Sequence, residues 1–94
     1  MSTLELPERL LIAECAALRE ELLAALECAE APFVIDAKAV RDVDGAGLQL
    51  LLSTALEARK RGVRLELDAS QGLSELLQVL RLEHRFQRIS ETSA

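Results

Sequence analysis

Three stretches of the chain carry leucine and alanine at the spacing of one helical face. The first begins near Ala13 and stops before Pro32, and its apolar stripe consists of Leu18, Leu22, Ala25, Leu26 and Ala29. The stripe of the second consists of Leu48, Leu51, Leu52 and Ala55, and that of the third of Leu73, Leu76, Leu77 and Leu80. Because an α-helix repeats every ~3.6 residues, each stretch predicts a helix with one buried side.

Shorter apolar runs between these stretches predict strands. Residues 4–6 and 10–12 are two such runs, separated by a turn at 7–9. Residues 33–35 are continuously apolar, which predicts a strand buried on both faces. Residues 63–68 alternate strictly, which predicts one buried and one exposed face. Residues 82–89 fit either a short strand or a short helix, and the tail at 91–94 is expected to fray.

The order of these elements indicates the fold class. Strands that alternate with helices form a mainly parallel sheet on which the helices pack, so the chain is α/β. A chain of 94 residues supports one modest core. We therefore expect a single domain over residues 1–90, with a core of aliphatic side chains, since Phe33 and Phe86 are the only aromatic residues.

Charge and hydropathy exclude several classes of function. A formal net charge of −5 argues against DNA or RNA as a partner, because phosphate contacts need a basic face. The longest uncharged, mainly apolar stretch, residues 45–56, is too short to span a bilayer. The first ten residues lack the basic and apolar pattern of a signal peptide, so we expect a cytoplasmic protein.

Candidate catalytic and metal-binding residues are few. Cys15 and Cys28 fall on one predicted helix, ~20 Å apart along its axis, which is too far for a disulfide. His84 is the only histidine and has no nucleophile or carboxylate pair in a recognisable motif. We therefore predict no catalytic set, no metal and no cofactor, and interpret both cysteines as structural.

The loop with the sequence RDVDGAGLQLLL, residues 41–52, is the most distinctive segment. As a calcium loop that starts at Asp42 it fails, because Ser53 stands where a bidentate Glu is required. As a phosphate-binding loop it is weak, because it lacks a following Lys and carries two acids. Asp44 is a suitable N-cap for the second helix, and Gly45 and Gly47 would also permit a tight turn.

The five residues Asp44-Gly45-Ala46-Gly47-Leu48 resemble the Asp-Ser-x-Gly-Leu or Asp-Thr-x-Gly-Leu signature of STAS domains, the anti-anti-sigma factor-like family. The likeness extends over nearly the whole chain, including the segments RGVRLEL and LSELLQVLRLEHRF. It implies a small layer sandwich with a mixed, mostly parallel sheet of four or five strands. The first strand would be antiparallel, and the helices would cover one face.

The resemblance also implies a function. STAS domains of this type are mostly not enzymes but bind a protein partner, such as an anti-sigma kinase. The kinase phosphorylates the hydroxyl directly after the signature Asp, and the added charge releases the partner. Here that position is Gly45, and Ala46 has no hydroxyl either. We therefore expect a non-catalytic docking module without the usual phosphorylation control.

The expected partner-binding residues lie in the 41–49 loop and the first turns of the helix that follows. They are Arg41, Asp42, Asp44, Gly45, Ala46, Gly47 and Gln49. The partner would be an anti-sigma kinase or a chemotaxis, two-component or other sensor protein. An alternative keeps the fold and makes the chain a cytoplasmic STAS subunit bound to the ATPase of an ABC-type phospholipid transporter. An alternative of another class is a small nucleotide- or ligand-binding module.

Overall fold

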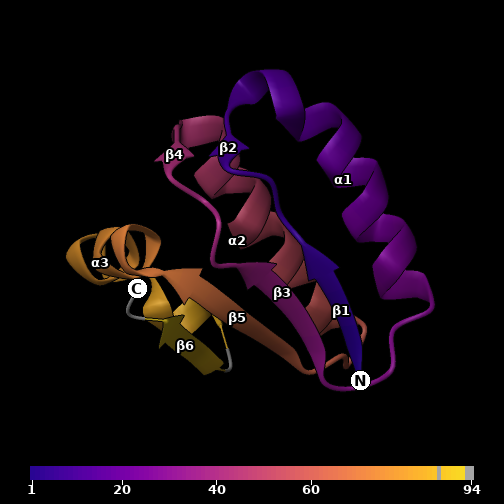
Figure 1. The fold of residues 1–94 in the computed structure, drawn as a ribbon. Coiled ribbons are helices and arrows are strands. Elements are labelled where there is room, and N and C mark those ends of the chain that lie inside the picture. The colour runs from indigo at the N-terminus through magenta and orange to yellow at the C-terminus, as the bar shows by residue number, and fades with distance from the viewer. Residues whose placement is uncertain (87, 93–94) are drawn as a thin grey trace.

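The computed structural model describes residues 1–86 and 88–92 as an α/β fold (Figure 1). Its elements in chain order are β1 (Ser2–Glu5), β2 (Arg9–Leu10), α1 (Ile12–Glu27), β3 (Phe33–Ala37), β4 (Asp42–Val43), α2 (Gly45–Lys60), β5 (Leu65–Ser70), α3 (Gln71–Val79), the 3-10 turn η1 (Glu83–Arg85) and β6 (Arg88–Thr92). The predicted order of helices and strands is confirmed. Two elements, β4 and η1, are too short to leave a periodic pattern in the sequence.

Four strands form the main sheet in the order β1-β3-β5-β6, and every pairing in it is parallel. The helices α1, α2 and α3 each connect one strand to its neighbour, and all three connections step across the sheet from β1 toward β6. Because crossovers of this kind are right-handed, α1, α2 and α3 lie on one face, as predicted. Figure 1 shows α1 and α2 side by side on that face.

The expectation of a mixed sheet with an antiparallel first strand is wrong for the described residues. Leu4 of β1 lies opposite Ile35 of β3 in a parallel ladder. The segment after β1 does not close a hairpin. Instead β2 leaves the main sheet and pairs in parallel with β4, Leu10 opposite Val43. The chain therefore reaches β3 only through α1, and a crossover helix delivers the next strand in parallel.

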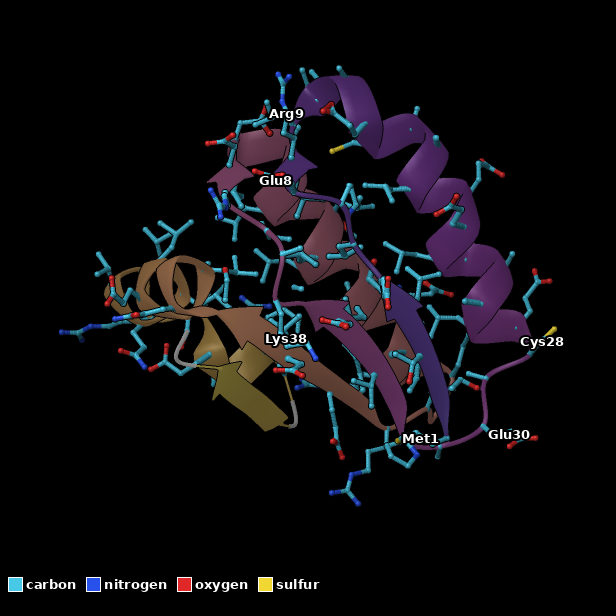
Figure 2. The ribbon with its side chains drawn as sticks, viewed as in Figure 1. Met1, Glu8, Arg9, Cys28, Glu30 and Lys38 are labelled. Carbon is cyan, nitrogen blue, oxygen red and sulfur yellow. The ribbon has the colours of Figure 1, made fainter. Side chains whose placement is uncertain are left out.

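Burial alternates along both central strands. In β5 the predicted pattern is confirmed, because Leu65, Leu67 and Ala69 are buried and the residues between them are not. The prediction that β3 is buried on both faces is wrong. Val34 and Asp36 are only half-buried, since the three helices of the described residues lie on the other face of the sheet. On that face the ammonium nitrogen of Lys38, labelled in Figure 2, lies 3.6 Å from carboxylate oxygens of both Asp36 and Asp68.

The core lies between the sheet and the helices. It contains the centres of the predicted stripes, among them Leu18, Leu22 and Leu26 of α1. The stripes differ from the structure at their ends. Ala25 and Ala29 are half-buried, and Leu80 is 46% exposed because α3 stops one residue before it.

Several element boundaries differ from the prediction by a few residues. The second predicted strand ends at Leu10, and Ile12 begins α1 instead. For residues 82–89 the sequence allowed either a short helix or a short strand. The segment contains a helical turn, η1, followed by the start of the strand β6. β6 continues to Thr92 and so includes part of the segment expected to fray, whereas positions 93–94 lie outside the described residues. No helix in the described ranges is long and apolar enough to cross a membrane.

The C-terminus of α3 carries an arginine in a conformation that suits glycine. Arg81 has φ +56°, and the N–H of Leu82 donates to the carbonyl of Leu77 at 2.8 Å. This is the hydrogen-bond pattern of a Schellman C-cap, in which the left-handed position is usually Gly. The left-handed conformation costs a non-glycine residue ~1 kcal/mol, which the chain carries at this position.

Replacing Arg81 by glycine is expected to stabilise the fold. The gain in the free energy of unfolding is ~0.5–1 kcal/mol, because relief of the left-handed strain exceeds the added entropy of the unfolded chain. Urea denaturation of the two proteins measures it. Gly62→Ala is the matched control, since Gly62 has φ +70° and open space around it, and this variant is expected to lose ~1 kcal/mol. No gain from Arg81→Gly would contradict the capping role.

Candidate functional site

The carboxylate of Asp44 caps two helices at once. Its Oδ1 accepts a hydrogen bond from the N–H of Gly47 in α2 at 2.9 Å. Its Oδ2 accepts one from the N–H of Ile12, the first residue of α1, also at 2.9 Å. The N-cap residue of α1, Leu11, has no side-chain acceptor of its own. Asp44 therefore satisfies unpaired N–H groups at both helix starts.

These contacts favour the charged form of Asp44. The hydrogen bond from Gly47 and then that from Ile12 lower the pKa of the carboxyl group below its ordinary value. The positive ends of two helix dipoles act in the same direction. A serine or threonine would present one side-chain oxygen where two acceptors are used, so the position specifically suits a carboxylate.

Gly47 is required by the close approach of α2 to β2. It is buried, and a Cβ atom there would overlap the carbonyl oxygen of Leu10 and lie 2.9 Å from the Leu10 carbonyl carbon. Gly45 is different. It is exposed, and a Cβ atom at this position would meet no atom within 4 Å. Neither Gly45 nor Gly47 has a positive φ, so a tight turn does not explain the two glycines. The close approach of α2 explains Gly47 only, and a serine would fit at position 45.

The predicted partner-binding residues gather around this double cap. Arg41, Asp42, Gly45 and Gln49 are exposed, whereas Asp44 and Ala46 are half-buried. Gly47 is buried, so it shapes the surface and does not offer a contact to a partner.

The loop is anchored to the neighbouring β2 segment. The backbone N–H of Arg41 donates to the carbonyl of Glu8 at 2.8 Å. The Arg41 guanidinium Nε also lies 3.6 Å from a carboxylate oxygen of Glu8. Figure 2 shows Glu8 and Arg9 beside β2 and β4, at the end of the molecule where α1 and α2 begin. The loop therefore has a fixed position relative to both helices.

A groove between α1 and α2 continues from the loop. It has a volume of about 440 Å³, and its lining combines two leucines with small and polar side chains: Cys15, Ala16, Arg19, Leu23, Ala46, Gln49, Leu50, Ser53, Thr54 and Glu57. Ala46 and Gln49 belong to both the loop and the groove. The predicted loop and this groove are therefore one continuous surface.

Several residues of this surface were not identified from the sequence. Ile12 is 73% exposed at the start of α1, where the hydrogen bond to Asp44 fixes its backbone. The sequence pattern placed it in a strand. A signal was present, because Ile12 does not fall on the stripe of Leu18, Leu22 and Leu26. No sequence motif marks the α1 side of the groove, which includes Cys15 and Leu23, because this side is formed only when the two helices pack together.

The hydroxyl and thiol groups of the groove are held in different ways. The Thr54 hydroxyl is buried and donates to the carbonyl of Leu50 at 2.8 Å, whereas Ser53 is exposed. Burial, followed by the nearby Asp44 and Glu14 carboxylates, raises the pKa of the Cys15 thiol above its ordinary value. The thiol is therefore the dominant form at neutral pH, which is not the state of a nucleophilic cysteine.

Asp44 also occupies the place where an anion would bind. A phosphate at a helix N-terminus is held by unpaired N–H groups. Here the N–H groups of Ile12 and Gly47 already donate to Asp44, whose negative charge opposes a second anion. Within residues 1–86 and 88–92, no group of three or more His, Cys, Asp and Glu side chains is placed to hold a metal ion.

The two glycines of the loop are expected to respond oppositely to alanine. Gly47→Ala should lower the free energy of unfolding by ~1–3 kcal/mol, because the added methyl group overlaps the Leu10 backbone. Gly45→Ala should leave it unchanged or raise it by ~0.5 kcal/mol, because alanine fits and restricts the unfolded chain. Denaturant titration of the pair measures both. Equal losses would show that α2 does not approach β2 as described.

The stabilising effect of Asp44 is expected to depend on pH. Its pKa is lower in the folded than in the unfolded state, so its contribution is fully present above pH ~4 and is lost as the pH falls through the folded-state value. Asp44→Asn places an amide N–H opposite the N–H of Ile12, so it should be less stable than the native protein at pH 7. This difference should shrink at pH 2–3. A difference independent of pH would contradict the charged double cap.

Comparisons with known proteins agree with this architecture. A family model described as "Mlab, STAS domain" matches residues 1–90. A crystal structure of a sulfate transporter family protein from Wolinella succinogenes superposes with a TM-score of 0.70 and 17% sequence identity. That alignment covers 96% of this chain and 76% of the other, and at this identity it shows the fold. The comparison with curated protein sequences finds no significant match.

Proposed function

This chain belongs to the STAS domain family, and from that membership we propose that it is a non-catalytic protein-docking module. Its docking surface consists of the exposed part of the 41–49 loop, Ile12 and the groove between α1 and α2. Docking is not controlled by phosphorylation of the signature position. One observation carries the proposal: the loop and the groove share Ala46 and Gln49 and form a single surface beside Gly45.

The composition of the surface suits a protein partner. Exposed Ile12 supplies an apolar anchor, and Arg41, Asp42 and Gln49 surround the loop with polar groups. An apolar centre with a polar rim is the usual arrangement of a protein interface. The backbone beneath it is fixed by the Asp44 cap, which limits the ordering cost of association.

The absence of phosphorylation control rests on Gly45. In STAS domains that are released by a kinase, the acceptor hydroxyl follows the signature Asp directly. Gly45 has space for a side chain, so packing against the fold does not explain the missing hydroxyl. Further along α2, the Thr54 hydroxyl is buried and hydrogen-bonded, and the exposed Ser53 lies about two helical turns from the signature position. We infer that partner binding is regulated through partner concentration or partner state.

The partner is expected to come from one of two groups. One contains anti-sigma kinases and chemotaxis, two-component or other sensor proteins of bacterial regulation. The other is the ATPase of an ABC-type phospholipid transporter, for which the chain would be a cytoplasmic subunit. Affinity purification of the native complex, followed by mass spectrometry, distinguishes these groups directly. Recovery of no protein partner, combined with thermal stabilisation by a nucleotide, would favour the ligand-binding alternative.

A negative charge at position 45 is expected to weaken docking without weakening the fold. Gly45→Asp should lower affinity for the purified partner at least ~10-fold, because the carboxylate adds unpaired charge to a desolvated surface. Stability should be unchanged or slightly higher, since an acid at the first turn suits the helix dipole. Isothermal titration calorimetry and urea denaturation measure the two effects.

Two control variants test whether the effect is local. Gly72→Asp adds the same charge near the start of α3, where a side chain also meets open space. It should leave affinity unchanged. Gly45→Ser adds a small neutral side chain and should cause a smaller loss than Gly45→Asp. Equal affinity for the native protein and Gly45→Asp would place the interface elsewhere.

A further inference from the structure

We propose that the free edge of β1, together with the hollow between β1 and α1, binds an extended basic segment of a protein partner as an added strand. This site is separate from the docking surface of the proposed function. It would give the module a second point of attachment on the opposite side of α1.

The backbone of β1 has one unpaired edge. Among the strands of residues 1–86 and 88–92, β1 is at the end of the sheet and pairs with β3 alone. The N–H of Ser2 donates to the carbonyl of Pro32, and that of Leu6 donates to the carbonyl of Asp36 at 2.8 Å. Successive residues of a strand direct these groups to opposite sides, so the N–H and C=O of Thr3 and Glu5 point away from β3. Both residues are exposed, and such an edge accepts another strand.

A hollow runs beside this edge. It is a shallow, open depression of about 610 Å³ between the end of β1 and one side of α1. Small apolar residues, Pro7, Ala13 and Ala17, line it next to the buried Leu6 and Leu18. A strand added to β1 would direct every second side chain toward this hollow. The small side chains of α1 leave space for aliphatic residues of the added strand.

The rim of the hollow determines the charge of the occupant. Glu5, Glu14 and Glu21 line it, and no lysine or arginine is among the lining residues. Glu14 is only partly satisfied: its Oε1 lies 3.8 Å from the guanidinium of Arg9, whereas its Oε2 is enclosed and has no hydrogen-bond partner. A lysine or arginine of the bound segment would supply a donor after a small rotation of this carboxylate.

Charge also distinguishes a basic partner from a second copy of the chain. Two copies meeting at this edge would bring together two acidic rims on molecules of net charge −5. A segment in which lysine or arginine alternates with aliphatic residues fits both the rim and the hollow. It would place its aliphatic side chains in the hollow, and its backbone would pair with Thr3 and Glu5.

The two surfaces lie on different sides of α1. Ala16 and Arg19 face the groove toward α2, whereas Ala17 and Glu21 line the hollow beside β1. Neighbouring alanines therefore provide a matched pair for substitution, since both are exposed and lie on the same helix. A substitution at Ala16 therefore tests docking at the groove, and one at Ala17 tests strand addition at β1, so the two proposals can fail independently.

The test uses the full chain and a synthetic acetylated octapeptide of alternating lysine and valine, titrated at 50 mM and 200 mM salt. We expect saturable binding, with NMR shift changes centred on Thr3, Glu5, Ala17 and Glu21. The corresponding glutamate–valine peptide should bind at least ~10-fold more weakly, because it repels the rim. Absence of binding by the lysine peptide, or shift changes spread over the whole acidic surface, would overturn the proposal.

Three variants localise the site. Thr3→Pro removes one outward N–H and is compatible with an edge strand, and Ala17→Arg fills the hollow with like charge. Each variant should lower the affinity for the lysine–valine peptide at least ~10-fold, whereas Ala16→Arg should change this affinity little. Urea denaturation identifies any variant that fails to fold. If Thr3→Pro fails to fold, Ala17→Arg alone still tests the site. Equal affinities for Ala16→Arg and Ala17→Arg would contradict the proposed site.

Discussion

The carboxylate of Asp44 accepts hydrogen bonds from the first turn of α2 and from Ile12 at the start of α1, which lies 32 residues earlier in the chain than Asp44. This arrangement requires α1 and α2 to begin at the same point, beside the pair of short strands β2 and β4. It also requires α2 to approach the backbone of Leu10 closely, which only glycine at position 47 permits. The cap and the close approach reinforce each other. Together they fix the angle at which the two helices leave the loop, and hence the groove between them.

The surface chemistry follows from this constraint. Both carboxylate oxygens of Asp44 are occupied by structural hydrogen bonds, so this side chain serves as a helix cap, and its negative charge opposes a second anion at the two helix starts. The loop presents the exposed Gly45 and the polar side chains of Arg41, Asp42 and Gln49, and the exposed apolar side chain of Ile12 stands at the start of α1, which Asp44 caps. Such a surface suits recognition of another protein more than chemistry on a small molecule. In our proposal, the acidic hollow on the other side of α1 binds a second partner segment.

Periodicity predicted the long elements well, since the buried centres of α1, α2, α3 and β5 follow from the spacing of their apolar residues. Periodicity did not predict the features that depend on which strands pair with each other and which sheet face the helices cover. The parallel direction of β1 depends on β2 pairing with β4, and a two-residue strand leaves no pattern. The burial of β3 depends on which sheet face the helices cover. The motif identified the family and the N-cap role of Asp44, but the bond to Ile12 and the different roles of Gly45 and Gly47 required the three-dimensional structure.

Hydrogen exchange of the native complex tests the docking account most directly. The chain is compared alone and bound to the protein recovered with it, and backbone amides are monitored by mass spectrometry. The account predicts slower exchange at residues 41–46 and at the first turns of α1 and α2, with little change in α3. Unchanged exchange in the loop and in both helix starts, together with protection confined to α3 or η1, would contradict it.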